Sequence, residues 1–306
     1  MPPVRVPLAL PFTPPLDAEA LLDHFARRAI PGVEDISDVT YARSLSLLHG
    51  PGLVTLRLGA TGAAAPHRPA RPASPDERDT IQGTLVLADP RDRAEAEALC
   101  RALLDLDHDP APVRARLGED ALLGAAVIAR PGRRVPGAAG PTEPCVRTIL
   151  GQQVSLAAAA TAAGRLVQRF GEPLGPLASG GVTRLFPSPG TLAAVAPDAL
   201  AMPRSRARSL VGLAGVLASG ELVLRRGGDG AAAREQLLAL PGIGPWSAAY
   251  IVMRVLGDHD VFLAGDLGVR RALERAGLAA DPRSAAALAE RWRPLRSYAL
   301  HYLWSL

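Results

Sequence analysis

The sequence predicts a two-part fold, an α+β N-terminal domain followed by an all-α unit. Before about residue 110, stretches of alternating apolar residues stand between stretches with helical spacing, whereas after it only helical spacing recurs. Short Pro and Gly breaks divide the second part, as in helix connections of a compact bundle. With 306 residues, 48% of them hydrophobic, the chain can bury the cores of two or three domains.

The N-terminal domain, residues 1–110, is expected to hold two helices and several strands. Apolar residues recur at helical spacing in the first segment, alternate in the next two, and return to helical spacing in the last. These segments are Leu16–Ile30, Tyr41–Leu58, Ile81–Leu87 and Arg91–Asp105. The run at 59–79 is rich in Pro and Ala and too polar to bury much apolar area. We therefore predict a long, mobile hairpin loop there.

The rest of the chain is expected to be helical, without strands. Pairs such as Pro131-Gly132 and Pro241-Gly242 mark the connections between helices. The periodicity predicts helices over 111–129, 144–170, 188–195, 205–218, 230–240, 245–256, 266–276 and 284–303.

Charge and composition limit the chemistry open to this chain. A net charge of +4 permits a polyanionic partner without selecting one. Every basic side chain other than histidine is arginine, and a Schiff-base mechanism needs an amine. Cys100 and Cys145 lie far apart, unlike the paired ligands of zinc or iron-sulfur sites, so no metal centre is expected. Prolines interrupt the apolar start and no run is long enough to span a bilayer, which predicts a cytoplasmic protein.

The segment 240–250, LPGIGPWSAAY, predicts a glycine-containing hairpin between two helices. Gly242 and Gly244 would let the backbone turn tightly and approach another molecule closely. Amide groups at the start of the second helix lack helical partners, so they can donate to a DNA phosphate. An ordinary turn between packed helices explains the motif equally well when it is taken alone.

Asp266 lies in the segment 260–271, DVFLAGDLGVRR, which follows the hairpin by about sixteen residues. It stands where a loop enters a helix, so on its own it would be assigned as a helix N-cap. In combination with the hairpin, a catalytic carboxylate becomes the favoured interpretation.

These motifs make the chain resemble the helix-hairpin-helix DNA glycosylases, specifically the bacterial DNA-3-methyladenine glycosylase II (AlkA-type) group. The matching stretches are YARSL at 41–45, ILGQQVS at 149–155, the hairpin, Gly265-Asp266, and RWRPLRSYAL at 291–300. The resemblance covers nearly all of the chain apart from the insertion at 59–79. It implies a small sheet domain beside a helix-hairpin-helix glycosylase core of two helical subdomains, 111–141 with 259–306, and 142–258.

The resemblance implies a monofunctional DNA glycosylase in base excision repair. Such an enzyme flips an alkylated base of the 3-methyladenine or 7-methylguanine class out of the duplex and hydrolyses its N-glycosidic bond. Bond cleavage makes the sugar oxocarbenium-like, and Asp266 would stabilise that cation. An alkylated base leaves as a neutral molecule, so no strong general acid is needed. Asp266 would also orient or deprotonate the attacking water.

By the same resemblance, Trp246, Tyr250 and Trp304 line the base pocket. Trp246 and Tyr250 are four residues apart and share a helix face. Their electron-rich rings would favour a cationic base, although core packing is the alternative role for each. Trp292 is assigned to the core, and His24 and Arg28, which match positions bordering the pocket, are expected on the solvated surface.

The DNA-binding residues implied are Gly242, Gly244, Gln152 and Gln153. Flipping leaves a gap that a wedge must fill, and the best-known relatives carry leucine where this chain has Gln153. A glutamine could occupy the gap and hydrogen-bond to the orphaned base. Its alternative role is a surface residue at a helix start.

Lyase-type members of the superfamily have a lysine where this chain has Trp246, so hydrolysis is favoured over strand cleavage. No cofactor is expected, although the hairpin could hold a monovalent or divalent cation. The expected partner is double-stranded DNA containing alkylated bases, bound by a monomer in the nucleoid region. Two other functions stay open: a non-catalytic binder of damaged DNA, and a glycosylase for oxidised or deaminated bases.

Overall fold

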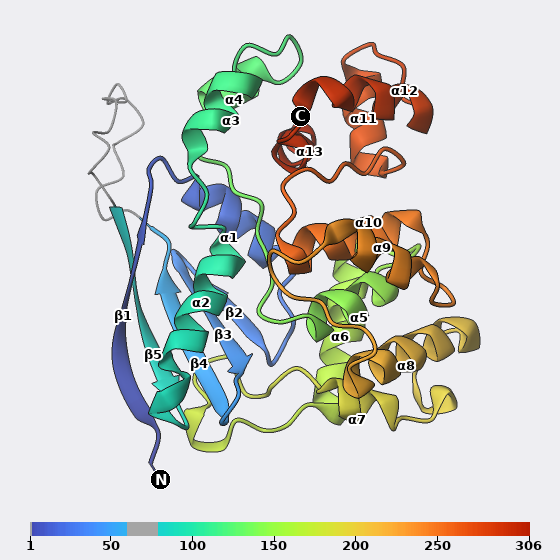
Figure 1. Ribbon diagram of the computed structural model, residues 1–306. Helices are drawn as coiled ribbons and strands as arrows, with labels where there is room; N and C mark the ends of the chain where they lie inside the picture. Colours follow the sequence, from blue (N-terminus) through green and yellow to red (C-terminus); the bar gives the residue numbers. More distant parts are fainter. Residues whose placement is uncertain (1, 60–78) are drawn as a thin grey trace.

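The computed structural model describes residues 2–59 and 79–306, and it confirms an α+β domain followed by an all-α core (Figure 1). The strands form one antiparallel sheet in the order β1-β5-β4-β3-β2. Their bounds are β1 Val4–Phe12, β2 Glu34–Ser37, β3 Thr40–Ser46, β4 Pro51–Arg57 and β5 Asp79–Leu87. The loop predicted at 59–79 lies outside the described residues except at its two ends.

Strand β1 was not predicted, because Pro7 and Pro11 interrupt its sequence. It lies at the edge of the sheet and pairs only with β5, with Leu8 opposite Gly83. In an edge strand, the backbone nitrogen of a proline can face away from the neighbouring strand, so no hydrogen bond between the strands is lost. The alternation of exposed and buried residues from Arg5 to Phe12 is that of a sheet with one covered face.

Both faces of the sheet are covered. Helices α1 (Ala18–Ala26) and α2 (Arg93–Leu104) pack on one face, where Phe25 stacks on Tyr41 with ring centroids 4.3 Å apart. Leu53 and Val86 are paired across β4 and β5 and point to the other face. The apolar residues that cover them are Leu174, Leu177, Val182 and Leu185.

The helical part follows the predicted order, but three predicted helices are each divided in two. The helices are α3 Pro110–Leu117, α4 Gly124–Ala129, α5 Thr142–Leu150, α6 Leu156–Phe170, α7 Pro189–Ala193, α8 Arg204–Ser219, α9 Gly230–Leu238, α10 Pro245–Ile251, α11 Leu267–Arg275, α12 Pro282–Ala289 and α13 Arg296–Leu303. A π-helical turn, Val252–Leu256, continues α10. Short 3₁₀ turns occur at Pro90–Asp92, Gly175–Leu177, Pro197–Ala199 and Glu290–Trp292.

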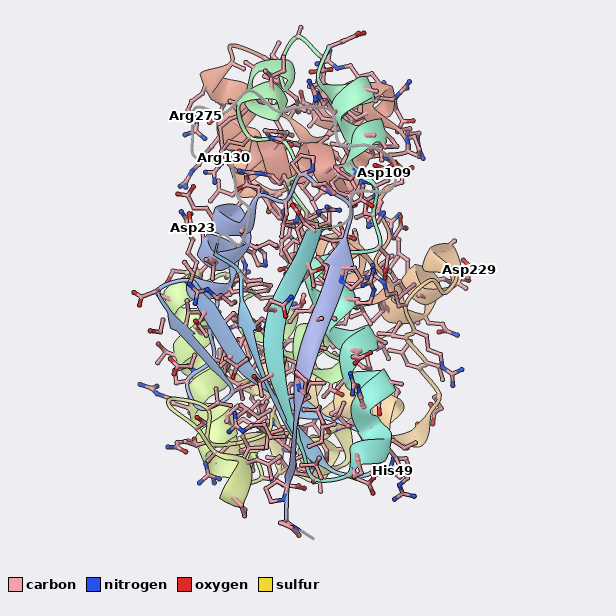
Figure 2. All side chains as sticks on the ribbon, turned by 90° about the vertical axis from the view of Figure 1, so that its left-hand side faces the viewer. Asp23, His49, Asp109, Arg130, Asp229 and Arg275 are labelled. Carbon is pink, nitrogen blue, oxygen red and sulfur yellow. The ribbon has the colours of Figure 1, made fainter. Side chains whose placement is uncertain are left out.

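The helices share two hydrophobic clusters. One is built from residues between 145 and 256, on helices α5 to α10, together with Ile30 and Val33 of the N-terminal part. The other joins α3 and α4 to α11, α12 and α13, so the beginning of the helical part packs against its end. Figure 1 shows the second group above the first. In Figure 2, Asp229 before α9 and Arg275 at the end of α11 mark the two groups.

A buried ion-pair network, which we call the Glu143 network, joins the sheet domain to α5. Arg43 of β3 donates to Glu143 with Nη2 and Oε2 2.5 Å apart, and Arg147 contacts Glu143 at 2.9 Å and Glu34 at 3.3 Å. The Tyr41 hydroxyl donates to Glu34 at 2.6 Å. Burial alone would raise the pKa of Glu143, but the two guanidinium groups outweigh it and lower that pKa.

Candidate active site

Asp266 lies at the N-terminus of α11, where its backbone is extended and its side chain caps the helix. Oδ1 accepts hydrogen bonds from the amides of Gly268 at 2.8 Å and Val269 at 3.2 Å. The carboxylate is therefore held by two unpaired donors of the first turn, where the helix dipole also favours negative charge. The side chain is half-buried, so capping does not remove it from contact with other molecules.

Two tryptophans from different helices meet at this carboxylate. The indole Nε1 of Trp304, which follows α13, donates to Oδ1 at 2.9 Å. The indole Nε1 of Trp246, in the first turn of α10, donates to Oδ2 at 3.2 Å. The structure thus brings the predicted catalytic residue together with two of the three aromatic residues assigned to the base pocket.

The third aromatic residue, Tyr250, lies one turn further along α10. Its ring stacks on Trp246 with centroids 5.0 Å apart and an interplanar angle of 7°. Trp246 is 38% exposed, and Tyr250 and Trp304 are half-buried, so none of the three is a fully buried core residue. Trp292, in contrast, is 1% exposed and donates to Asp120, in line with its assignment to the core.

A cluster of basic residues behind Tyr250 was not recognised from the sequence. The guanidinium of Arg254 lies 5.7 Å from the Tyr250 ring centroid and is 2.5 Å from Nε2 of His24. His24 and Arg28 were both expected on the solvated surface; that expectation is wrong, because both are half-buried and face a cavity beside Tyr250. The His24 ring also lies 5.9 Å from that of His301. A cavity of ≈ 50 Å³ is lined by His24, Arg28, Tyr250 and Arg254, among others.

The charges in this cluster follow from burial and from neighbouring guanidinium groups. Burial, together with Arg28 and Arg254, lowers the pKa of both His24 and His301, so both imidazoles are neutral at pH 7. Burial lowers the pKa of Arg254 to about 10, which leaves it charged. For Tyr250, burial would raise the pKa, but Arg254 and Arg28 outweigh it and lower that pKa.

Part of this cluster could have been found in the sequence. Arg254 follows Trp246 and Tyr250 at intervals of four residues, and such positions share a helix face. His301 precedes Trp304 by three residues in the same way, and their rings lie 4.8 Å apart. The contact between Arg254 and His24 spans 230 positions, so no local pattern indicates it.

The hairpin connects α9 to α10, and its two glycines have different constraints. Gly242 has φ +83°, and a Cβ added there would lie 2.1 Å from Ser209 Oγ, so only glycine fits. Gly244 is the N-cap of α10 with φ −89°, is exposed, and has open space where a side chain would be. Ile243 between them is buried and anchors the turn.

The predicted DNA-binding glutamines lie on the loop between α5 and α6. Gln152 Nε2 donates to the carbonyl of Gly242 at 2.9 Å, which fixes this loop beside the hairpin. Gln153 is exposed and has a left-handed backbone, φ +58°. The two glutamines therefore lie beside the hairpin glycines, and of these four residues only Gln152 is half-buried.

Other classes of site are not seen in the described part of the chain. Residues 2–59 and 79–306 contain no group of three His, Cys, Asp or Glu side chains that could hold a metal ion. No helix within those ranges is long and apolar enough to cross a membrane. Burial raises the pKa of the Cys100 and Cys145 thiols to about 12, so neither is a ready nucleophile.

Two family models match the sequence in succession. The AlkA N-terminal domain matches residues 7–140, and the HhH-GPD superfamily base excision DNA repair protein matches residues 146–296. The chain is 36% identical over 299 residues to DNA-3-methyladenine glycosylase 2 from Escherichia coli K12, covering 96% of this chain and 95% of that protein.

A longer relative is also similar. The chain is 44% identical over 300 residues to a probable bifunctional transcriptional activator/DNA repair enzyme AlkA from Mycobacterium tuberculosis H37Rv. The alignment covers 98% of this chain but 57% of that protein, so the chain spans little more than half of the mycobacterial relative. The fold resembles a 3-methyladenine DNA glycosylase from Archaeoglobus fulgidus with a TM-score of 0.78, at 21% identity and 98% and 97% coverage.

The fold, the hairpin and these matches define a helix-hairpin-helix base excision DNA repair protein. Within that class, the chain belongs to the AlkA-type DNA-3-methyladenine glycosylase family. The family resemblance inferred from the sequence motifs is thereby confirmed.

Proposed function

We propose that this protein is a monofunctional DNA glycosylase that releases alkylated bases, of the 3-methyladenine and 7-methylguanine class, from double-stranded DNA. The main observation is the carboxylate of Asp266, fixed by two helix amides and two indoles beside a stacked aromatic pair. Membership of the family supports the proposal.

The reaction depends mainly on an anion that stabilises the sugar cation, because a cationic base can leave without being protonated by an acid. When the bond between C1′ and the base nitrogen breaks, its electron pair leaves with the base and the sugar becomes an oxocarbenium-like cation. A base that is alkylated and positively charged becomes neutral on leaving. Asp266 stabilises the sugar cation electrostatically, and a water molecule then bonds to C1′ and loses a proton to the carboxylate or to solvent.

The aromatic residues would hold the flipped base next to this anion. Trp246 and Tyr250 offer a stacked pair on one side of Asp266, and Trp304 contacts it from α13. Ring faces attract cations, whereas Arg254 and Arg28 place positive charge behind Tyr250. The attraction for a cationic base therefore comes from the rings and from Asp266, and not from the wider field of the site.

The site has contributions from both proposed helical subdomains. We propose the division 1–110 for the sheet domain, 142–258 for the hairpin subdomain, and 111–141 with 259–306 for the other. Trp246 and Tyr250 then come from the hairpin subdomain, and Asp266 and Trp304 come from the other. A flipped base inserted between the subdomains would reach all four side chains.

Duplex DNA would be held through the exposed hairpin and the neighbouring loop. Gly244 leaves the first amides of α10 open to a phosphate, and Gln153 lies on the loop that Gln152 fixes to the hairpin. We propose that one copy of the protein acts alone on DNA, in the nucleoid region of the cell.

The experiment that tests this function is base release from methylated duplex DNA, with the released bases separated by chromatography. We expect 3-methyladenine and 7-methylguanine to appear with time and enzyme concentration. Tight DNA binding without any released base would instead favour a non-catalytic binder, which needs no positioned carboxylate. Release confined to oxidised or deaminated bases, measured on defined duplexes, would replace the proposed substrate class.

A further inference from the structure

The two oxygens of Asp266 have unequal surroundings. Oδ1 accepts three hydrogen bonds, from the amides of Gly268 and Val269 and from the indole of Trp304, at 2.8, 3.2 and 2.9 Å. Oδ2 accepts one, from Trp246, at 3.2 Å. Because a carboxylate oxygen has about two lone-pair sites, Oδ1 is saturated and Oδ2 retains capacity to face another group.

The two tryptophan donors also differ in how firmly they are held. Trp304 is half-buried between His301, with ring centroids 4.8 Å apart, and the first turn of α11. A Cβ added at Gly268 would lie 2.7 Å from Trp304 Cδ1 and 3.0 Å from Asp266 Oδ1, so the indole edge occupies space that only glycine leaves. Trp246 is 38% exposed and forms the longer hydrogen bond.

We propose that Trp304 is a positioning residue, which fixes Oδ1 and so presents Oδ2 of Asp266 to the sugar cation. The inference rests on the proposed glycosylase function and names Oδ2 as the Asp266 oxygen that faces the sugar. The amides alone leave the carboxylate free to turn about its Cβ–Cγ bond, whereas the indole adds a third donor from another helix. A carboxylate that is already in the right orientation need not reorient when the cation forms, so the free-energy cost of reorganisation is smaller.

Gly268 also helps to position the Asp266 carboxylate. Its missing side chain allows the indole to approach Oδ1, and its backbone amide donates to the same oxygen. Gly268 is not in the left-handed region, so alanine would be tolerated by the backbone. Replacing it with alanine would place a Cβ 2.7 Å from Trp304 Cδ1 and 3.0 Å from Asp266 Oδ1, which disturbs their contact while leaving both side chains in the protein.

The test compares affinity for two duplexes, one with a pyrrolidine cation in place of the sugar and one with a neutral tetrahydrofuran abasic site. The ratio of the two affinities reports how well the carboxylate meets a positive charge. We expect Trp304→Phe, which keeps an aromatic ring but removes the N–H donor, to lower this ratio by about tenfold. Gly268→Ala should lower it in the same direction.

Matched controls are available for both substitutions. Trp292→Phe also removes a tryptophan donor from an aspartate, since Trp292 Nε1 donates to Asp120 at 2.8 Å in the core. Gly265→Ala adds a methyl group next to Asp266 where no atom lies within 4 Å. Both controls should keep the wild-type ratio, which distinguishes positioning of Asp266 from a loss of packing.

A double-mutant cycle completes the test. In an Asp266→Asn background, Trp304→Phe should cause no further change in the ratio, because Trp304 acts through the carboxylate. If Trp304→Phe keeps the wild-type ratio, the inference is overturned; if that variant does not fold, an unchanged ratio in Gly268→Ala overturns it. Failure of the proposed function is recognised separately, as a wild-type protein that releases no methylated base.

Discussion

Asp266 has a structural and a chemical role that depend on the same contacts. As the N-cap of α11 it satisfies two amides that have no helical partner, and those amides hold the carboxylate in place for the reaction. The alternative N-cap role considered for this residue is thus compatible with catalysis. A capping residue is a favourable place for a charge, because backbone amides bind one of its oxygens, and here the Trp304 indole adds a third donor to that oxygen.

The substitution Asp266→Asn separates the two roles. Asparagine caps helices about as well as aspartate, so we expect the protein to remain folded and to bind a tetrahydrofuran duplex with similar affinity. Release of methylated bases should fall roughly a hundredfold or more, because the developing cation loses its counter-charge. Single-turnover base release measures the effect. A variant with a rate near wild type would remove Asp266 from the mechanism.

The absence of lysine leads to a second prediction, that the protein releases bases without cutting the strand. A lyase step needs an amine that forms a Schiff base with the sugar aldehyde, and this sequence contains no lysine side chain to supply it. Abasic products should stay intact until alkali is added. Borohydride treatment during turnover, followed by a denaturing gel, should trap no covalent complex. Efficient trapping together with strand scission would contradict hydrolysis by water.

Local spacing was enough to identify some site residues but not how they meet. The hairpin and the loop before Asp266 are contiguous motifs, and Trp246 and Tyr250 share a helix face, so sequence patterns point to them. The hydrogen bond between Trp304 and Asp266 joins positions 38 residues apart, and that between Arg254 and His24 joins positions 230 apart. Such contacts depend on how the helices pack, which periodicity does not specify.

At the scale of elements, the hairpin predicts that a substitution at Gly244 can weaken DNA binding without destabilising the fold. In Gly244→Asp the new carboxylate would lie at the N-cap of α10, a position that favours aspartate, in open space and without backbone strain. We expect affinity for damaged and undamaged duplex to fall by a similar factor, because phosphate contacts carry no base specificity. Fluorescence anisotropy with both duplexes provides the measurement.

Gly244→Asn is the matched control for that substitution. It has nearly the same shape and capping ability but no charge, so it should retain most of the affinity. Equal losses in the two variants would show that bulk, and not charge, disturbs the contact. A change in base preference at constant affinity would show that the hairpin does not hold a phosphate.

The Glu143 network predicts a large effect on stability. Glu143→Gln leaves the buried Arg43 guanidinium and the half-buried Arg147 guanidinium with less compensating charge, and breaking a buried pair from one side costs about 3 kcal/mol or more. Urea unfolding should show this decrease. In the exposed pair of Arg93 and Glu97, Glu97→Gln should change the free energy of unfolding by less than about 1 kcal/mol. Similar small effects in both variants would contradict the prediction.

Element boundaries show where sequence patterns were insufficient. The helix predicted over 144–170 is broken at 151–155, where Ser155 caps α6 by accepting from the Ala158 amide at 3.2 Å. A serine before a helical run is a recognisable start signal, but the apolar periodicity continued across it. Strand β1 was missed for the opposite reason, because its prolines are break signals that an edge strand tolerates.

At the scale of the whole molecule, three histidines of the described residues lie where parts of the chain meet. His24 of α1 contacts Arg254 and His301, which come from the two helical groups. His108, between α2 and α3, stacks on Tyr298 of α13 with ring centroids 4.2 Å apart. Burial, with neighbouring charges, lowers the pKa of all three imidazoles, that of His108 to about 4.

These three histidines predict that the protein loses stability in mild acid. In the unfolded chain they take up protons as the pH falls below about 6.5, whereas in the folded protein they stay neutral to lower pH. The unfolded state then binds more protons, so the free energy of unfolding decreases as the pH falls, by up to about 4 kcal/mol per pH unit for three groups. The decrease ends for each group once the pH falls below its folded pKa, which for His108 is about 4.

Urea unfolding at pH 7.5, 6.5, 5.5 and 4.5 measures this dependence. The urea midpoint should fall only slightly between pH 7.5 and pH 6.5, and it should fall steeply below pH 6.5. His108→Gln removes one of the three groups and should reduce the slope by about a third, while its effect at pH 7.5 reports any loss of packing against Tyr298. Below about pH 4.5, Glu143 adds to the loss of stability. Its pKa is lowered in the folded protein, so the unfolded chain takes up this proton first. A free energy of unfolding that stays constant from pH 7 to 5 would mean that these imidazoles take up protons in the folded protein at the same pH as in the unfolded chain. The junction between the parts would then carry positive charges in mild acid, which its burial disfavours.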